Sequence, residues 1–326
     1  MARPLRALVS TSPLFAALAL VAALPSCGAR TGLILPEVAP DTAVADTAFD
    51  TADAADADAD ETLDAADSAS TIDVLPPIDS PPFCKDPTVL LVYVVTESNE
   101  LLSFEPPSAT FRSIGTISCP ASGGATPFSM AVDHTGIAYV VFSDGELFRV
   151  NVKDASCKAT SYTSPGGAFT TFGMGFVRDP TGTTETLYVA TTGTPSTLAK
   201  IDTTTMKIAS VATLDPEVLS AELTGTGAGQ LFGFFQNRAA GDGSSSIAEI
   251  DTTTGAIAGR ADLPTVSQGS GWAFAFWGGD FYTFTAPTSV GHSIVQRYRP
   301  GDGSVVQVQE LNSIVVGAGV STCAPG

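Results

Sequence analysis

A unit of short strands recurs along the chain from residue 130 onward, and this repetition limits the fold more than any other feature. Each copy contains a strand of small and apolar residues, a turn, a second strand rich in aromatic and β-branched residues, and a third strand. The copies begin near residues 130, 174, 220 and 273, a spacing of about 44 to 53 residues. Repetition at such a spacing indicates a repeat architecture, and the unit length fits four short strands without helical periodicity.

The two ends of the repetitive region complete the count. Residues 89–95 and 101–104 look like the second and third strands of a unit that lacks its first strand, and residues 316–320 look like a first strand without followers. Joined, they make a fifth unit. We therefore predict an all-β fold, a five-bladed β-propeller whose ring is closed by strands from both termini, which leaves no long open sheet edge. Six blades is the alternative, if residues 161–171 or another long connection hide further strands.

Two turns between the predicted third and fourth strands share nearly the same sequence. Residues 251–255 read Asp-Thr-Thr-Thr-Gly, and residues 202–205 read Asp-Thr-Thr-Thr. Asp favours tight turns because its carboxylate accepts hydrogen bonds from nearby backbone amides, and Gly favours them because it tolerates positive φ. We therefore interpret Asp202 and Asp251 as turn residues before ligands.

Four cysteines lie within the repetitive region, in addition to Cys27 near the N-terminus. An even number in an exported chain indicates disulfides. Cys84 precedes the first strand of the split unit and Cys323 follows its last, so a bond between them would lock the two ends of the ring. Cys119 and Cys157 fall at comparable points of neighbouring units. The sequence predicts the bridges 84–323 and 119–157.

The repeats resemble those of YVTN- and NHL-like β-propellers. The residues that carry the resemblance are 187–189, Leu-Tyr-Val, and 250–255, Ile-Asp-Thr-Thr-Thr-Gly, and the pattern covers residues 88–323. Residues 169–176 also resemble stretches of uncharacterised envelope propeller lipoproteins of myxobacteria. We assign residues 84–326 to the propeller domain.

The N-terminus has the layout of an export signal. Arg3 and Arg6 precede an apolar run over residues 7–24 that polar residues and a proline interrupt. This layout predicts a signal peptide over residues 1–26, since a membrane-spanning helix needs about 20 apolar residues. Leu24, Ser26 and Cys27 resemble the lipobox of bacterial lipoproteins, which implies lipidation at Cys27 and, with Gly28 after it, the outer membrane. A secreted protein with an incidental cysteine and an uncleaved anchor are the alternatives.

An acidic segment separates Cys27 from the repeats. Residues 31–84 contain thirteen Asp and Glu and no Lys or Arg. Like charges repel and few large apolar side chains are present, so we expect residues 27–83 to form a disordered acidic linker of Asp, Ala and Thr. Its Asp-rich run lacks the Gly and Glu that a calcium loop requires, and no metal site is expected. The chain carries a formal net charge of −19 and no basic stripe, which argues against nucleic-acid binding.

Candidate functional residues are few. The sequence contains no recognised nucleophile elbow, zinc motif or phosphate loop. Five-bladed propellers include glycoside hydrolases with carboxylates on inner strands, so that resemblance makes Glu222, Asp133 and Asp179 weak catalytic candidates. His134 stands in a predicted turn, where a polar residue is the default. Trp277, before two glycines, is a candidate for ligand binding.

Two hypotheses about function remain. We expect a membrane-tethered binding or scaffold lipoprotein of the outer membrane, facing the periplasm or the surface, that presents its propeller to a protein or glycan partner. In that case the chain is a monomer without cofactor and without catalytic activity. The alternative is an envelope hydrolase, similar to a glycosidase or lactonase, with two or three carboxylates in the central channel.

Overall fold

A computed structural model describes residues 72–75, 84–179, 184–236 and 243–326. The predicted signal peptide, the predicted lipidation site Cys27 and most of the predicted acidic linker lie outside the described residues. The described regular structure is almost entirely β-strand, with two short 3-10 helices, η1 (Pro87–Leu90) and η2 (Gly167–Phe169). Within the described ranges, neither helix approaches the length or apolar character of a membrane span.

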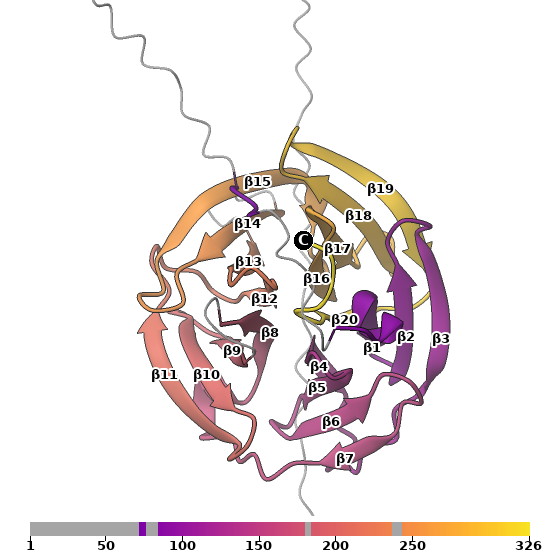
Figure 1. The fold of residues 1–326 in the computed structure, drawn as a ribbon, viewed down its shortest axis with the longest axis vertical. Helices are drawn as coiled ribbons and strands as arrows, with labels where there is room; N and C mark the ends of the chain where they lie inside the picture. The colour runs from indigo at the N-terminus through magenta and orange to yellow at the C-terminus, as the bar shows by residue number, and fades with distance from the viewer. Residues whose placement is uncertain (1–71, 76–83, 180–183, 237–242) are drawn as a thin grey trace, which may run out of the picture. The chain divides into compact units, whose positions relative to one another are not determined.

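Five antiparallel sheets of four strands stand around a ring as the blades of a β-propeller (Figure 1). Blade 1 contains, from the axis outward, β20 (Val315–Val320), β1 (Val92–Thr96), β2 (Glu100–Glu105) and β3 (Thr110–Thr116). Blade 2 contains β4 (Pro127–Val132), β5 (Ile137–Phe142), β6 (Leu147–Asn151) and β7 (Cys157–Ala159). Blade 3 contains β8 (Phe172–Arg178), β9 (Glu185–Thr191), β10 (Thr197–Asp202) and β11 (Lys207–Thr213).

The last two blades follow the same order. Blade 4 contains β12 (Glu222–Gly225), β13 (Leu231–Gln236), β14 (Ser244–Ile250) and β15 (Ile257–Ser267). Blade 5 contains β16 (Trp272–Trp277), β17 (Asp280–Thr285), β18 (Ser293–Arg299) and β19 (Ser304–Leu311). The five-bladed prediction is therefore confirmed. The six-bladed alternative is wrong, because all twenty described strands belong to these five sheets and residues 161–171 contain η2 and no strand.

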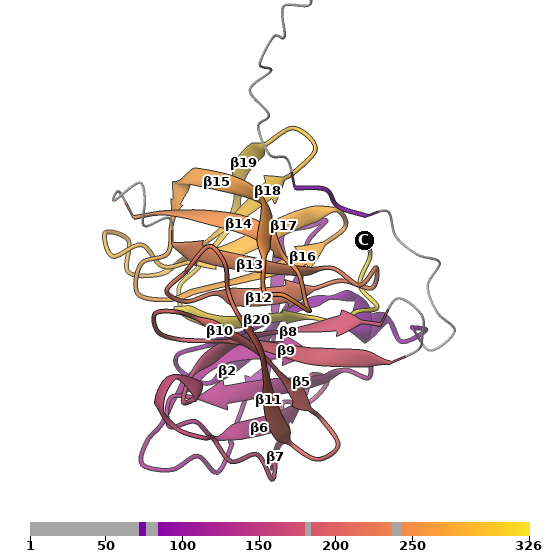
Figure 2. The ribbon, with the colours of Figure 1, turned by 90° about the vertical axis from the view of Figure 1, so that its left-hand side faces the viewer.

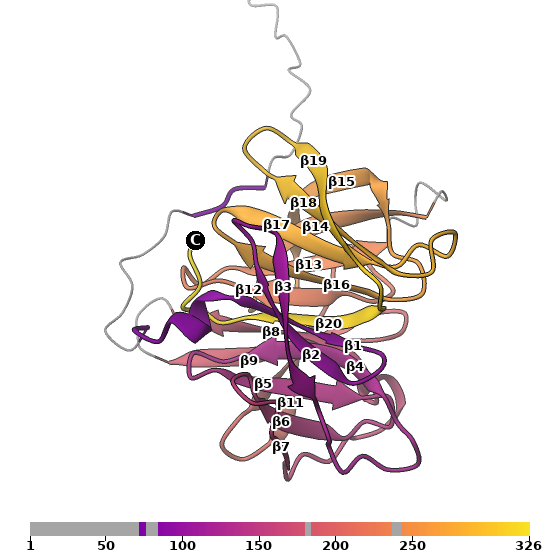
Figure 3. The same cartoon turned by 90° about the vertical axis from the view of Figure 1, so that its right-hand side faces the viewer.

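Strands from the two ends of the domain close the ring, as the sequence predicts. β20 pairs antiparallel with β1, and Val94 lies opposite Ala318 in the register. Figure 3 shows the yellow β20 beside β1 and β4. Blade 1 thus has four paired strands although its members lie more than 200 residues apart in the sequence.

Glycines allow the inner strands of blades 3 and 4 to lie close to each other. A Cβ atom at Gly173 of β8 would lie 2.0 Å from the carbonyl oxygen of Ala221 and 2.7 Å from the Cα of Glu222. On β12, a Cβ at Gly225 would lie 2.0 Å from the carbonyl oxygen of Phe176. Only glycine permits such an approach of two backbones. Backbone contacts therefore join β8 to β12 near the axis.

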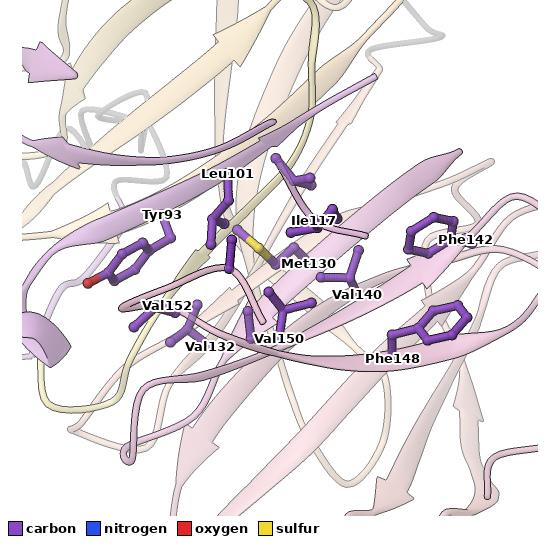
Figure 4. Close-up of a cluster of buried hydrophobic side chains, with 13 residues drawn as sticks. Tyr93, Leu101, Ile117, Met130, Val132, Val140, Phe142, Phe148, Val150 and Val152 are labelled. Atoms are coloured by element: carbon purple, nitrogen blue, oxygen red, sulfur yellow. The ribbon is translucent and has the colours of Figure 1, made fainter. Parts of the chain in front are cut away.

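Apolar cores fill the spaces between adjacent blades. Figure 4 shows one of them, in which Tyr93 and Leu101 of blade 1 face Met130, Val140 and other side chains of blade 2. A β-strand directs alternate side chains to opposite faces, so each strand serves two such cores. The ring is held by these contacts between the blades as well as by the hydrogen bonds within each blade.

Strand β16 shows this alternation clearly. Phe274 and Phe276 pack toward blade 4, where the ring of Phe276 lies 6.1 Å from that of Phe232. The small residues Ala273 and Ala275 face the core shared with blade 1. The two faces therefore differ in side-chain volume according to the space available on each side.

The two disulfides expected from the sequence are present. Cys84 is bonded to Cys323 across 239 residues of sequence, and Cys119 to Cys157 across 38 residues. The first bond joins the segment before η1 to the segment after β20, where the ring closes. The second joins blades 1 and 2, because Cys119 follows β3 and Cys157 begins β7.

Candidate functional site

A cleft of about 850 Å³ lies where the turn between β4 and β5 of blade 2 meets the strands of blade 3. Its lining side chains mostly carry hydroxyl or charged groups: Asp133, His134, Thr184, Glu185, Thr186, Lys200, Asp202, Thr203, Thr204, Thr205 and Lys207, together with Phe176, Ile201 and Ala209. A volume of this size is typical of small-molecule sites, which range over about 300–1,000 Å³.

Glu185 organises one wall of the cleft. Its Oε1 accepts hydrogen bonds from the backbone amide of His134 at 2.8 Å and lies 2.7 Å from the His134 Nδ1. Its Oε2 accepts from the hydroxyl of Thr322 at 2.7 Å. Glu185 belongs to blade 3, His134 to blade 2, and Thr322 follows the inner strand of blade 1. One buried carboxyl group therefore bridges three blades.

Arg178 contacts Thr322, the same residue that donates to Glu185. It is buried at the end of β8, and its Nη2 donates to the carbonyl oxygen of Thr322 at 2.8 Å and lies 3.4 Å from the Cys84 Sγ. Burial lowers the pKa of the Arg178 guanidinium, and the nearby charge of Glu185 opposes that shift. The ring-closing disulfide, Arg178, Thr322 and Glu185 form one connected group behind the cleft.

The opposite wall is the turn between β10 and β11. The Oδ1 of Asp202 accepts from the amides of Thr204 at 2.8 Å and Thr205 at 2.9 Å, and these bonds lower the pKa of Asp202. Asp251 makes the equivalent bonds in blade 4, to the amides of Thr253 and Thr254. The interpretation of both aspartates as turn residues is confirmed. In blade 3 the turn also lines the cleft.

Two lysines complete the cleft on its outer side. Lys200 lies on β10 and Lys207 on β11, and both are exposed. On a chain with an acidic excess, two ammonium groups beside several threonine hydroxyls give the cleft hydrogen-bond donors as well as acceptors. The cleft can therefore form hydrogen bonds with both the donor and the acceptor groups of a polar ligand.

Glu222 occupies a different place, near the axis of the ring. It begins β12, is 3% exposed, and its Oε2 accepts from the hydroxyl of Ser129 on β4 at 2.7 Å. Burial raises the pKa of Glu222 well above its ordinary value, and the bond from Ser129 opposes the shift. Its carboxyl group thus links the inner strands of blades 2 and 4.

The other two catalytic candidates are engaged in turns. The Oδ1 of Asp133 accepts from the amides of Thr135 and Ile137, both at 2.9 Å, and from the Thr135 hydroxyl. Asp179 accepts from the hydroxyl of Thr184. In the described part of the chain, Glu222, Asp133 and Asp179 have separate hydrogen-bond partners. Only Asp133 lines the cleft.

Trp277 lies at the end of β16 and is half-buried. Its indole Nε1 donates to the carbonyl oxygen of Leu90 at 2.7 Å, and its ring packs against the core between blades 5 and 1. These contacts give Trp277 a packing role, since they join blade 5 to the segment before β1. A role in ligand binding stays a prediction.

Sequence reasoning found Asp133 and His134 but missed Glu185, Lys200 and Lys207. Lys200 interrupts the apolar residues of β10, which is the ordinary alternation of a half-exposed strand. Glu185 begins β9, and no motif marks it. Among the described residues, no group of three or more His, Cys, Asp or Glu side chains is arranged to hold a metal ion.

The buried carboxyl of Glu222 predicts a dependence of stability on pH. A neutral Glu222 contributes stability that is fully present below the ordinary pKa of 4.5 and is lost as the pH rises through the raised pKa of the folded state. The Glu222→Gln variant keeps a neutral acceptor for Ser129 at every pH. We expect it to match the wild type near pH 4 and to exceed its thermal stability increasingly toward about pH 8.

Thermal unfolding at a series of pH values measures this difference. Glu217→Gln serves as the control, because Glu217 is exposed on the connection before β12. We expect the control to follow the wild type throughout. A gap between wild type and Glu222→Gln that stays constant with pH would show that Glu222 does not titrate with a raised pKa.

Comparisons with known proteins identify no family. No family model matches the chain, and no curated protein matches it. Among solved structures, the chain is similar to Kuenenia stuttgartiensis hydrazine synthase, with 14% identity over 70% of this chain and 66% of that one and a TM-score of 0.39. It is also similar to the extracellular domain of a putative one-component system from B. thetaiotaomicron, with 12% identity, a TM-score of 0.34, and coverage of 68% and 27%.

The chain thus spans less than two thirds of the first of these structures and about a quarter of the second. Similarities at this level carry no argument about activity.

Proposed function

We propose that this protein is an envelope lipoprotein that binds a glycan in the cleft between blades 2 and 3. In this proposal the signal peptide is removed, Cys27 is lipidated at the outer membrane, and the acidic linker holds a YVTN/NHL-like propeller away from the lipid. The propeller is a binding module and its ring is the scaffold that positions the cleft.

The predicted location in the cell envelope is consistent with the presence of two disulfides. Disulfides form and persist in oxidising compartments such as the periplasm and the cell surface. The bond between Cys84 and Cys323 lies directly behind the cleft, where Arg178 contacts both it and Thr322. An exported protein can therefore hold one wall of its cleft with a bond that a reducing compartment would not maintain.

The composition of the cleft is the observation that carries the proposal. Threonine hydroxyls, carboxylates and two lysines surround a volume of about 850 Å³, and carbon atoms of these side chains and of Phe176, Ile201 and Ala209 make up the larger part of the lining surface. A sugar presents hydroxyl groups that both donate and accept, and these match the polar groups of the cleft. An apolar ligand would instead leave the polar groups of the cleft without partners, at a cost for each one.

The hydrolase hypothesis has weaker support. Glycoside hydrolysis requires two carboxyl groups about 5–10 Å apart on either side of the bond to be cleaved. Glu222 is buried and bonded to Ser129, whereas Asp133 is held by its own turn beside the cleft. Binding is the function that the geometry supports better.

Calorimetric titration of the full chain with soluble oligosaccharides from bacterial envelope polysaccharides tests the proposal. We expect saturable binding that Lys200→Ala and Lys207→Ala each weaken about tenfold, since a hydrogen bond from a charged group contributes about 1.5–3 kcal/mol. Lys158→Ala is the matched control, because Lys158 is an exposed lysine on β7 that does not line the cleft. Equal weakening by all three variants, or no binding by the wild type, would contradict the assignment.

A further inference from the structure

A short segment of the linker lies against the propeller. Residues 72–75 read Ile-Asp-Val-Leu. Ile72 is 5% exposed and packs into the core between blades 4 and 5, together with Phe232 and Phe281, and Val74 packs against the same core. Figures 2 and 3 show the segment in purple beside these blades. It is 155 residues or more from its contacts in the sequence.

A single side chain holds the backbone of this segment. The Gln230 Nε2 donates to the carbonyl oxygen of Asp73 at 2.9 Å, and the Gln230 Oε1 accepts from the amide of Leu75 at 3.0 Å. One primary amide thus makes the same pair of bonds that a neighbouring strand would make to an extended peptide. These bonds do not depend on the side chains of the peptide.

Contacts with residues of blade 4 also hold Gln230 in place. It precedes β13, its backbone amide donates to the hydroxyl of Thr226 at 3.1 Å, and with residues 72–75 in place it is 6% exposed. Its Nε2 also lies 3.3 Å from the Oε1 of Glu249 on β14, which orients the amide plane. A buried, oriented amide at the mouth of an apolar seam is a built binding site for a peptide backbone.

The burial of the segment follows the two-residue period of an extended chain. Ile72 is buried and Val74 half-buried, whereas Asp73 and Leu75 are exposed. Recognition of an extended peptide commonly combines main-chain hydrogen bonds, which give affinity, with pockets for alternate side chains, which give specificity. Both components are present at this seam.

We propose that the seam between blades 4 and 5 is a peptide-binding site, and that residues 72–75 of the linker are its ligand within the same chain. The site takes an extended segment with β-branched aliphatic side chains at alternate positions, clamped by Gln230. In this proposal the linker first contacts the propeller at Ile72, beside blade 4, and not at Cys84, behind the cleft. The inference is independent of the glycan proposal, which concerns blades 2 and 3.

The proposal explains why a weak four-residue contact can persist. Residues 76–83 connect the segment to Cys84, which is fixed to the ring by its disulfide. A short connection gives the segment an effective concentration in the millimolar range at its site. A separate peptide of the same sequence must therefore compete with the attached one.

Hydrogen exchange on the full chain is the first test. We expect the Leu75 amide to exchange at least tenfold faster in Ile72→Asp and in Gln230→Leu than in the wild type. Gln268→Leu is the matched control, because Gln268 is a similarly buried glutamine before β16 and makes no described contact with the segment. Ile72→Asp changes only the linker, so it remains informative if Gln230→Leu does not fold.

Peptide binding in trans is the second test. A fluorescent synthetic peptide of residues 69–78 is titrated into the full chain carrying both Ile72→Asp and Val74→Asp, and into the wild type. We expect saturable binding to the variant, at least tenfold weaker binding to the wild type, whose site is filled, and no binding of a scrambled peptide. Unchanged Leu75 exchange in Ile72→Asp, or equal binding of the native and scrambled peptides to the variant, would overturn the proposal.

Discussion

The Gly173→Ala variant should lose about 3 kcal/mol of stability, the cost of forcing extra atoms into a closely packed site. Its Cβ would lie 2.0 Å from the carbonyl oxygen of Ala221 and 2.7 Å from the Cα of Glu222, and both are backbone atoms that cannot rotate away. The inner strands β8 and β12 would have to separate, and the blades packed on them would follow. For a domain of this size we expect the midpoint of thermal unfolding to fall by about 6–12 °C.

Gly301→Ala is the control for this prediction. Gly301 lies in the turn between β18 and β19, its backbone is outside the left-handed region, and a Cβ there would meet no atom within 4 Å. The free energy of unfolding of the Gly301→Ala variant should differ from that of the wild type by less than about 0.5 kcal/mol. Equal midpoints for the two variants would show that β8 and β12 are not in contact near the axis.

Removal of the ring-closing disulfide should produce the other large effect. The chain-entropy model gives about 5.5 kcal/mol for a loop of 239 residues and about 4 kcal/mol for one of 38 residues. The Cys84→Ala/Cys323→Ala variant should therefore be less stable than the Cys119→Ala/Cys157→Ala variant. The loss of a packing surface for Arg178 adds to the difference.

Urea unfolding of both double variants and the wild type measures these losses. We expect the first double variant to have the lowest midpoint, and to lose cleft binding along with stability because Thr322 and Glu185 depend on the same closure. The second double variant should keep its binding affinity. A first double variant as stable as the second would mean that the strand pairing of β1 with β20 closes the ring without help from the disulfide.

The architecture could be predicted because each blade repeats a local pattern. The small inner strand, the aromatic second strand and the Asp-Thr turn each arise from neighbouring residues, and Asp202 and Asp251 make the turn bonds that their sequence indicates. The positions of Cys84 and Cys323 relative to the repeats were sufficient to pair them. Closure of the ring follows from the same count.

The cleft and the linker site could not be predicted, because they depend on how one blade is rotated against the next. His134 and Glu185 are 51 residues apart, and Gln230 and Asp73 are 157 apart. Glu222 was found from its unusual place on an inner strand, but its bond to Ser129 crosses from blade 4 to blade 2. Neither a period nor a motif encodes such contacts.

Site-specific photocrosslinking in the native cells tests the central proposal most directly. A photoreactive residue replaces Thr204, in the turn that lines the cleft, or Thr253, in the matching turn of blade 4, where Asp251 makes the same bonds. The glycan proposal predicts a carbohydrate adduct at position 204 and none at position 253. Equal adducts at both positions, or an adduct at position 204 that contains only polypeptide, would contradict it.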